Sequence, residues 1–508
     1  MSAIATEAAL NVVPASNTRA RIRGLLLSTR ARVCAYSALM IAPCFWHSRV
    51  QAGDFSSHLY NAWLADLIGQ GAADRLVIVP QWTNVLFDLL LTALMNVFGA
   101  WGAEHIALPL VVLIFVWGAF AVVSALSGRR PWYILTFLVM LAYGWVFHMG
   151  FMNFYLSLGL CFWAFALLWK PDLISALCAV LLVALASLAH ALPVAWLTGT
   201  MAYVWVARKI RPRDRILLGF GCLALLVIVR HLLLVRFPAR WSAEQAISMT
   251  GADQVWVFSS KYYPLEILLL LVWLSLFRQV ARHHGEERLL LGIPFQLCVI
   301  ISAAVLLIPG AILLPGYSHA LRFISERMSL VVAVMFCALL GRASPGSHQK
   351  AAIAVMLGLF FSFLYVDTRA LNYVEDLMEQ NVAQIPPGSR VVSALCDQRR
   401  DVNLLAHTID RVCIGRCFSY ANYEASTAQF RIRAPYANPI VVSEYRESGA
   451  LQEGNYVVKP SDAPLYQIYL RRNYIATRVL KAGDVTGSTC FESTPSPRNL
   501  FREHSPAN

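Results

Sequence analysis

The sequence predicts an all-α polytopic membrane protein with about 11 transmembrane helices and a small C-terminal α/β domain outside the membrane. Hydrophobic residues make up 58% of the 508 residues and charged residues only 14%, a composition that soluble domains rarely have. Long apolar stretches recur through residues 33–366, whereas residues 367–508 lack them. The net charge of +13 comes mainly from short basic segments between the apolar stretches, so membrane topology explains it and no nucleic-acid partner is expected.

Apolar stretches of about 15 to 22 residues are the candidates for membrane-spanning helices. They are 33–48, 82–99, 105–126, 131–148, 153–169, 173–190, 193–207, 216–235, 262–277, 289–308, 323–340 and 351–366. The segments richest in Lys and Arg are 1–32, 127–132, 170–172, 207–215, 278–288 and 341–350. Because cytoplasmic loops carry an excess of Lys and Arg, these segments are predicted to be cytoplasmic, the amino terminus included.

One stretch must fail to cross, because two full spans between residue 49 and the basic segment 127–132 would place that segment outside. The stretch 82–99 carries Asn84, Asp88 and Asn96, and an uncompensated Asp at mid-bilayer depth costs about 3 kcal/mol or more. We therefore predict a re-entrant or surface-lying helix there, which leaves eleven spans.

This topology divides the chain into a cytoplasmic basic arm (1–32), a transmembrane domain (33–366) and an extracytoplasmic domain (367–508). The first outer loop covers residues 49–104. The first span could instead be a signal peptide, since Val50 and Ala52 loosely satisfy a cleavage site. The long basic arm and Arg49 inside that site favour an uncleaved anchor.

The segment 53–71 follows the first apolar stretch and holds Asp54 and His58 at the i, i+4 spacing of a helix. Its apolar residues recur about every four positions, which predicts a helix lying along the outer interface. Asp54 could be an N-cap and His58 could merely face headgroups. Alternatively, both side chains are catalytic.

Other polar residues are predicted to gather at the same outer edge, and ionisable residues within spans are functional candidates. They are His148, Asn153, His190, Arg230, Lys261, Arg322, Glu326 and Arg327. Each has a structural alternative: Arg230 can extend to the interface, and Arg322 and Glu326 can pair at i, i+4. A carboxylate among several cations, however, suits a base that works beside a phosphate leaving group.

This architecture resembles the C-type glycosyltransferase (GT-C) superfamily, which includes protein mannosyltransferases and the aminoarabinose and rhizobial lipopolysaccharide sugar transferases. The likeness lies in a basic amino terminus, one span, an acidic residue opening an interfacial helix, a helix that does not cross, many further spans and a soluble outer tail. The resemblance implies transfer of a sugar from a polyprenyl-phosphate donor to an envelope glycan, lipid or protein acceptor. It also implies a bacterial inner (plasma) membrane, with catalysis on the outer face.

Of the resembling positions, Asp54 in "GDFSSHLYNAW" matches the acidic residue that activates the acceptor in the superfamily. Relatives often have a second adjacent acid, where this chain has Gly53, and His58 could compensate. Among the cations predicted at the outer edge, Arg230, Arg322, Arg327 and Lys261 are the candidates to hold the donor phosphate. The resemblance requires no certain cofactor and leaves a divalent metal open.

Two other functions compete with the transferase. A transporter or lipid flippase would line a path at the bilayer midplane, often with broken helices in matched halves, whereas the charges here lie at one edge. A non-catalytic membrane scaffold would explain the tail but not the cluster of charges at the outer edge.

The tail is predicted to contain a turn that leads into a strand at 385–395 and another strand at 438–445, while 465–480 could be helix or strand. It also contains Cys396, Cys413, Cys417 and Cys490. Outside the cytoplasm these four cysteines favour disulfides, because Cys-x3-Cys without further ligands is a poor zinc signature.

Overall fold

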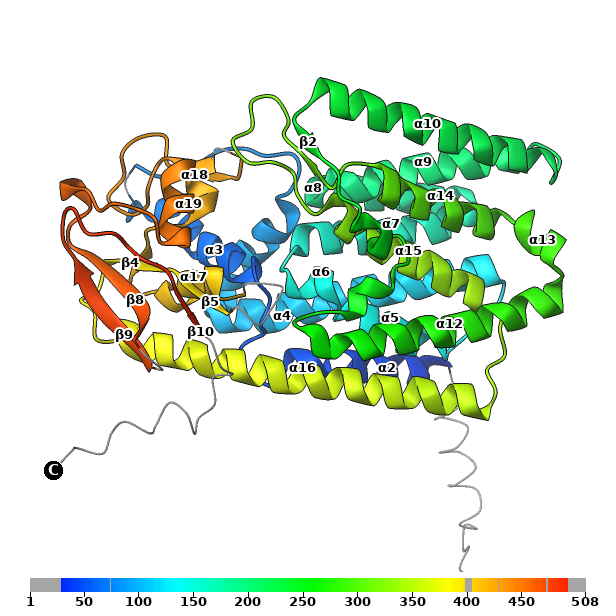
Figure 1. Ribbon diagram of the computed structural model, residues 1–508, viewed down its shortest axis with the longest axis horizontal. Helices are drawn as coiled ribbons and strands as arrows, with labels where there is room; N and C mark the ends of the chain where they lie inside the picture. The colour runs from blue at the N-terminus through cyan, green and yellow to red at the C-terminus, as the bar shows by residue number, and fades with distance from the viewer. Residues whose placement is uncertain (1–28, 74, 398–403, 428, 472–473, 492–508) are drawn as a thin grey trace, which may run out of the picture.

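The computed structural model describes residues 29–491 except 74, 398–403, 428 and 472–473. Up to residue 236 its helices are α2 (Thr29–Ile41), α3 (Phe55–Gly69), α4 (Leu86–Ser127), α5 (Ile134–Ala142), α6 (Trp145–His148), α7 (Met152–Trp169), α8 (Leu173–Ala189), α9 (Ala191–Ala207) and α10 (Asp214–Arg236). The next helices are α11 (Gln245–Ser248), α12 (Tyr263–His284), α13 (Glu286–Leu290), α14 (Ile293–Leu307), α15 (Ile324–Leu340) and α16 (Ser347–Val382). Figure 1 shows the long helices running side by side, with α3 and most of the short strands and helices of the C-terminal region gathered at one end.

Five helical segments are long and apolar enough to cross a membrane, judged by length and composition within the described residues. They are α4, α7, α10, α16 and Ser260–His284, which contains α12. The shorter apolar helices are Ile134–His148, α8, α9 and α14. Helix α10 buries none of its residues and exposes large apolar side chains along its length, as a lipid-facing helix does. These features are consistent with an integral membrane protein.

The predicted non-crossing stretch 82–99 forms the first arm of α4. That arm ends at Gly99, whose φ of 70° breaks the helix before the second arm begins. Asp88 lies within the first arm and is only 5% exposed, because it faces α3 and α7. Its carboxylate is therefore compensated by protein partners.

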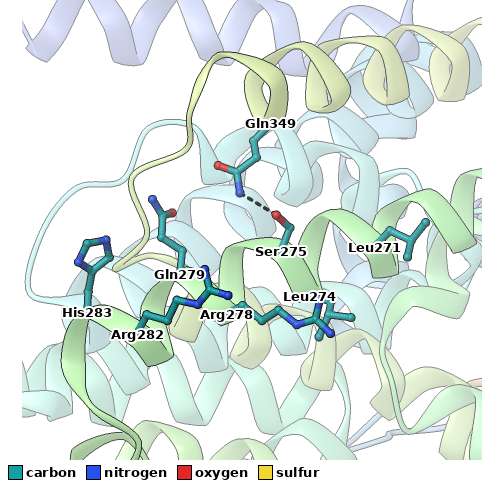
Figure 2. A pocket seen from close by; sticks show the side chains of 8 residues that line it. All are labelled: Leu271, Leu274, Ser275, Arg278, Gln279, Arg282, His283 and Gln349. Carbon is teal, nitrogen blue, oxygen red and sulfur yellow. Dashed lines mark hydrogen bonds between the residues drawn. The ribbon is translucent and has the colours of Figure 1, made fainter.

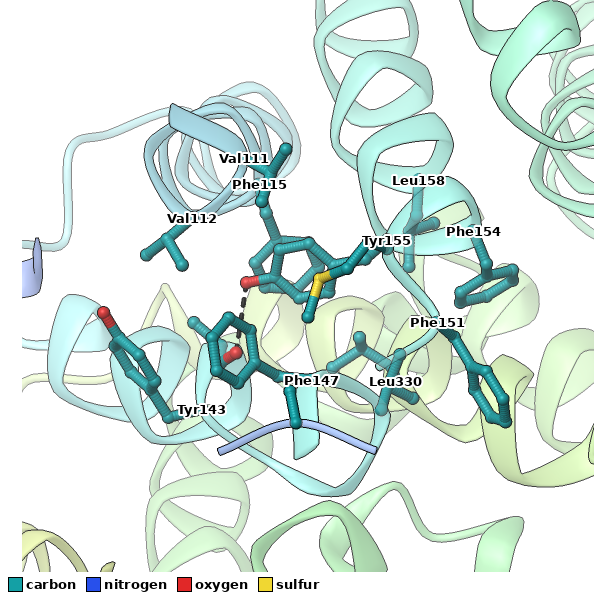
Figure 3. Close-up of a cluster of buried hydrophobic side chains, with 14 of the residues drawn as sticks. Val111, Val112, Phe115, Tyr143, Phe147, Phe151, Phe154, Tyr155, Leu158 and Leu330 are labelled. Carbon is teal, nitrogen blue, oxygen red and sulfur yellow. Dashed lines mark hydrogen bonds between the residues drawn. The ribbon is translucent and has the colours of Figure 1, made fainter. Parts of the chain in front are cut away.

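The centre of the bundle is the contact between the second arm of α4 and α7. A Cβ on Gly118 would lie 2.6 Å from the Gly159 carbonyl oxygen, so the two backbones approach closely only because both residues are glycine. Phe115 stacks on Tyr155 beside this contact, with ring centroids 4.5 Å apart. Figure 3 shows these rings within a cluster of buried side chains, where the Tyr155 hydroxyl donates to the Ala142 carbonyl.

Helix α16 connects the bundle to the C-terminal region without a break. It continues through position 367, where the sequence analysis placed a domain boundary. Beyond it lie the short helices α17 (Thr408–Cys413), α18 (Tyr423–Thr427) and α19 (Tyr445–Glu453). A charged cluster joins this region to the start of α3 and to α4.

In that cluster Arg411 donates to Glu375 of α16 through Nε and Nη2, both at 2.7 Å, and to the Val50 carbonyl at 2.9 Å. Its Nη1 also lies 3.4 Å from Glu104 of α4, which accepts from the Val50 N–H. Arg49 adds contacts to Glu375, Asp376 and Glu379. Arg411, Glu104 and Glu375 are buried, so their charges are balanced inside the protein.

The C-terminal region contains a four-stranded sheet in the order β6-β4-β8-β9. Its strands are β4 (Arg390–Ser393), β6 (Phe418–Ser419), β8 (Leu465–Arg471) and β9 (Tyr474–Leu480); β8 and β9 form an antiparallel pair, whereas β4 is parallel to both neighbours. In the segment 465–480, which the sequence left open between helix and strand, the described residues 465–471 and 474–480 are therefore strands. Smaller pairs join β1 (Val77–Ile78) to β7 (Ile432–Arg433), β2 (Ala239–Arg240) to β3 (Ala311–Ile312), and β5 (Leu395–Asp397) to β10 (Thr489–Phe491).

The strand predicted at 438–445 is wrong. The Asn438 side chain accepts the Ile440 N–H at 2.8 Å and turns the chain, and α19 begins at Tyr445. Val441 and Val442 are buried without belonging to a strand. Two disulfides join Cys396 to Cys490 and Cys413 to Cys417.

Candidate active site

Asp54 is held in place by the turn between α6 and α7. The Gly53 and Asp54 N–H groups donate to the carbonyls of His148 and Met149 at 2.8 and 3.0 Å. Gly150 closes the turn with φ of 84°, and a Cβ there would lie 2.5 Å from the Asp54 nitrogen. His148 contributes its Nδ1, 2.7 Å from the Gln51 carbonyl. The sequence around Gly150 therefore fixes the backbone of Asp54.

The Asp54 side chain makes no capping hydrogen bond to α3, although it occupies the N-cap position. The N-cap alternative thus lacks the contact that defines it. Asp54 Oδ1 instead lies 3.5 Å from His407 Nε2, and the carboxylate keeps 26% of its surface exposed. It is the carboxylate of this cluster that a ligand can reach.

His58 lies one turn further along α3 and is buried rather than facing headgroups. Its Nδ1 lies 2.7 Å from Asp88, which also accepts from Asn153 at 2.8 Å. Glu424 of α18 is 3.7 Å from the same nitrogen and accepts from Ser57. Burial opposes the charge of His58, but the carboxylates of Asp88 and Glu424 outweigh it and raise the pKa of His58 to about 9. Burial raises the pKa of Glu424 to about 7.

His407 connects Asp54 to the C-terminal region. Its Nδ1 lies 3.3 Å from Asp410, while Nε2 faces Asp54. Burial disfavours the imidazolium, yet the hydrogen bond to Asp410 and the charge of Asp54 raise the pKa of His407. The ring also packs on Tyr423, with centroids 5.1 Å apart. A protonated His407 would hold the Asp54 carboxylate in one position.

Arg327 of α15 carries the opposite charge and interacts electrostatically with Asp54. Its guanidinium lies 3.8 Å from the centre of the Phe151 ring, and its buried Nε has no hydrogen-bond partner among the residues that the structure describes. Its Nη1 is 3.4 Å from His190 Nε2.

The His190 ring constrains that contact, because its Nδ1 already accepts the Leu192 N–H that caps α9. A neutral imidazole has one acceptor nitrogen, so Nε2 carries the proton. Arg327 and His190 therefore present donors to one another, and an anion bound beside this pair could accept from both.

The loop between β3 and α15 covers this region. The His319 ring contacts the Tyr423 and Tyr445 rings, and the Gln429 side chain donates to the His319 carbonyl. Burial and the neighbouring Arg322 lower the pKa of His319. Arg322 is exposed on the same loop and lies near Tyr445.

Some predicted site residues lie elsewhere. Lys261 pairs with Asp367 at 2.7 Å, and Arg230 stacks on Trp241. Glu326 accepts from Ser325, and within the described residues it forms no ion pair with Arg322. Asp54, His58, His148, Asn153, His190 and Arg327 surround one region, with Arg322 on the loop above it.

The tail contributes residues to this site that were not predicted from the sequence. His407, Asp410, Tyr423 and Glu424 all border the site, as does Arg431, which donates to the Asp88 carbonyl at 3.1 Å. The segment "LAHTIDR" combines a histidine, an acid and an arginine, and this was the signal available. Asp88 was recognised only as an obstacle to crossing.

Within the described residues, no group of three or more His, Cys, Asp and Glu side chains is arranged to hold a metal ion. Comparison of the chain with protein-family models, curated proteins and solved structures gives no match.

Proposed function

We propose that the protein is a membrane glycosyltransferase that moves a sugar from a polyprenyl-phosphate donor to an acceptor hydroxyl outside the membrane. The observation that carries the proposal is the contrast between Asp54 and its neighbours. Asp88, Asp410 and Glu424 keep 7% or less of their side-chain surface exposed, whereas Asp54 keeps 26% and interacts electrostatically with Arg327. An accessible base beside an anion site is what this transfer needs.

Asp54 is the general base in this proposal. The acceptor O–H gives its proton to the carboxylate as the oxygen bonds to the anomeric carbon. The bond between that carbon and the phosphate oxygen breaks, and its electron pair leaves with the polyprenyl phosphate. A positioned base of this kind contributes about 10²- to 10⁴-fold to the rate.

Arg327 binds the donor phosphate in this proposal. The unpartnered Nε and the Nη1 that faces a second donor leave two N–H groups for phosphate oxygens. His190 adds a third donor through Nε2. These groups stabilise the charge that the phosphate gains as it leaves. Arg322, exposed on the covering loop, is placed to meet the donor as it enters.

The remaining polar residues position Asp54. His58 is protonated at neutral pH when its pKa is about 9, so it cannot act as the base there. It balances the buried charge of Asp88 and fixes the α3–α4 contact. His407 orients the Asp54 carboxylate from the side of the tail.

The proposal also includes the membrane topology that was predicted from the sequence. Eleven segments cross: α2, the second arm of α4, the α5–α6 pair, α7, α8, α9, α10, α12, α14, α15 and α16. The amino terminus is cytoplasmic, and Asp54, the first arm of α4 and the C-terminal domain lie outside a bacterial inner membrane. The donor then reaches the site from the outer leaflet, and the acceptor is an envelope glycan, lipid or protein.

Asp54→Asn tests the proposal, because Asn keeps the size of the side chain but cannot accept the proton. Purified protein in nanodiscs is given radiolabelled polyprenyl-phosphate sugars, and consumption of each is measured. The variant should insert normally, bind the donor and lose at least about a hundredfold in turnover.

Asp66→Asn is the matched control, since Asp66 lies on the same helix and bonds only Gln70 among the described residues. It should retain turnover. Near-normal turnover from a correctly inserted Asp54→Asn protein would remove the assignment of the base. Failure of the parent protein to consume any such donor would remove the transferase.

A further inference from the structure

A second polar site lies at the end of the bundle remote from Asp54. A pocket of about 470 Å³ opens between α12 and the start of α16, near α13 (Figures 1 and 2). Arg278, Arg282 and His283 bring three basic side chains to its lining, and no acidic residue lines it. The pocket is therefore built for an anion or for an acceptor-rich group.

The two arginines lack a charge partner in the described structure. Neither has a carboxylate oxygen within 4.0 Å among the described residues, and Glu287, which follows them in sequence, pairs with Arg213 at 3.9 Å instead. Arg278 and Arg282 are separated by one helical turn, and like charges at i, i+4 destabilise a helix. Basic residues in the last turn of α12 favour its dipole, but Arg278 lies a turn deeper than that effect reaches. A bound anion would remove the repulsion.

The polar wall opposite the arginines is already ordered. Gln349 of α16 donates to Ser275 at 2.9 Å, and its carbonyl oxygen accepts the Gly346 N–H (Figure 2). Gln279 exchanges hydrogen bonds with the backbone of Ser344. These bonds hold the first turn of α16 and the segment before it against α12 beside the pocket.

The pocket continues into an apolar surface along α12. Leu271 and Leu274 complete the lining one to two turns before the arginines, and they expose 58% and 42% of their surfaces. They belong to the segment of α12 that is apolar enough to cross a membrane. A small polar anion could bind the arginines, but it would make no contact with this apolar surface.

We propose that this pocket binds an anionic phospholipid. The phosphodiester accepts hydrogen bonds from Arg278 and Arg282, and an acyl chain lies along Leu271 and Leu274. Arginine suits this role because its planar fork meets two phosphate oxygens at once. Juxtamembrane basic pockets are a general means of recognising anionic headgroups. The site is separate from the proposed donor site, which lies at the other end of the bundle.

Native mass spectrometry of the purified protein tests this inference. The protein is equilibrated in mixed micelles of phosphatidylglycerol and phosphatidylcholine, and the lipids retained are counted. The parent protein should prefer phosphatidylglycerol, and Arg278→Gln with Arg282→Gln should lower the preference about 10- to 30-fold. Arg211→Gln with Arg213→Gln removes equal charge from another basic loop and should leave the preference unchanged.

The possible outcomes distinguish a phospholipid headgroup from free phosphate as the bound anion. An unchanged preference in the Arg278 and Arg282 variant overturns the proposal. Displacement of the lipid by millimolar inorganic phosphate would overturn the lipid assignment in favour of a free-phosphate site. If the glutamine variant does not fold, Arg278→Lys with Arg282→Lys keeps the charge but loses bidentate contacts. That variant should retain only part of the preference, and full retention would contradict the proposed geometry.

Discussion

The Asp54 carboxylate owes its chemistry to what surrounds it. Its backbone is fixed by the carbonyls of His148 and Met149, and its side chain meets His407 from the tail. The neighbouring acids pair with internal partners: Asp88 pairs with His58, and Asp410 pairs with His407. One acid is thereby kept accessible while the others are used to hold the site together.

His58 gives the site a measurable pH dependence. Its ordinary pKa is about 6.5, and its folded-state pKa of about 9 means that the folded protein binds the proton more tightly. Its stabilisation is complete below about pH 6.5 and is lost as the pH rises through about 9.

The melting temperature of the detergent-solubilised protein should therefore fall between pH 7 and pH 9.5 more steeply than that of His58→Gln. The difference in unfolding free energy is on the order of 2 kcal/mol. His348→Gln, at an exposed histidine, should follow the parent curve. Parallel curves for the parent and His58→Gln would show that His58 does not hold an extra proton.

At the residue scale, the sequence singled out candidate site residues in the first loop and the bundle, but it did not indicate their partners in the tail. Asp54 and His58 stood out because their spacing places them on one helix. His407 and Glu424 could not be found in the same way, because they are more than 340 positions away and only the folded chain brings them to α3. Lys261 and Arg230 were expected at the site, but each has a nearer partner.

At the scale of elements, α16 and α17 fasten the tail to the bundle. The Arg411 guanidinium lies between Glu375 of α16 and Glu104 of α4, and all three side chains are buried. Removing one member of a buried ionic cluster leaves the others uncompensated.

Arg411→Met should therefore lower the free energy of unfolding by about 3–5 kcal/mol, measured by thermal or denaturant unfolding in detergent. Arg471→Met, at an exposed tail position, should have little effect. Adding Glu375→Leu to Arg411→Met should recover part of the loss, because it removes one uncompensated carboxylate. Full stability of Arg411→Met would show that the cluster does not hold the tail.

Apolar stretches predicted the bundle helices well because each stretch is long and continuous. The prediction failed where short segments depend on their surroundings. The β-branched residues of 438–445 indicated a strand. The Asn438 side chain instead forms a turn there, and Val442 is buried against the sheet without joining it. The break of α4 at Gly99 was not predicted either, since a single glycine in an apolar helix is usually tolerated.

At the scale of the whole molecule, the proposed topology places the first loop and the tail on one side. Trp101→Cys and Gln380→Cys change exposed positions and can be introduced separately after the exposed Cys34 and Cys178 are replaced by serine. Both should react with a membrane-impermeant maleimide in intact spheroplasts, while Arg211→Cys should react only in inverted vesicles. Because ten segments cross between positions 101 and 380, a first arm of α4 that crosses would move both positions to the cytoplasmic side, so labelling of both only in inverted vesicles would contradict the proposed topology.

The pairing of Arg411 with Glu104 also has a consequence for biosynthesis. The two residues are 307 positions apart, which at about 5–20 residues per second separates their synthesis by roughly 15–60 s. During that interval Glu104 has no arginine to balance it, and Asp54 has no His407. The helical bundle can insert and pack while the future site stays open and hydrated. The proposed site is thus completed only after the tail has folded against the bundle, so an incomplete chain would hold the helices of the bundle without an assembled site.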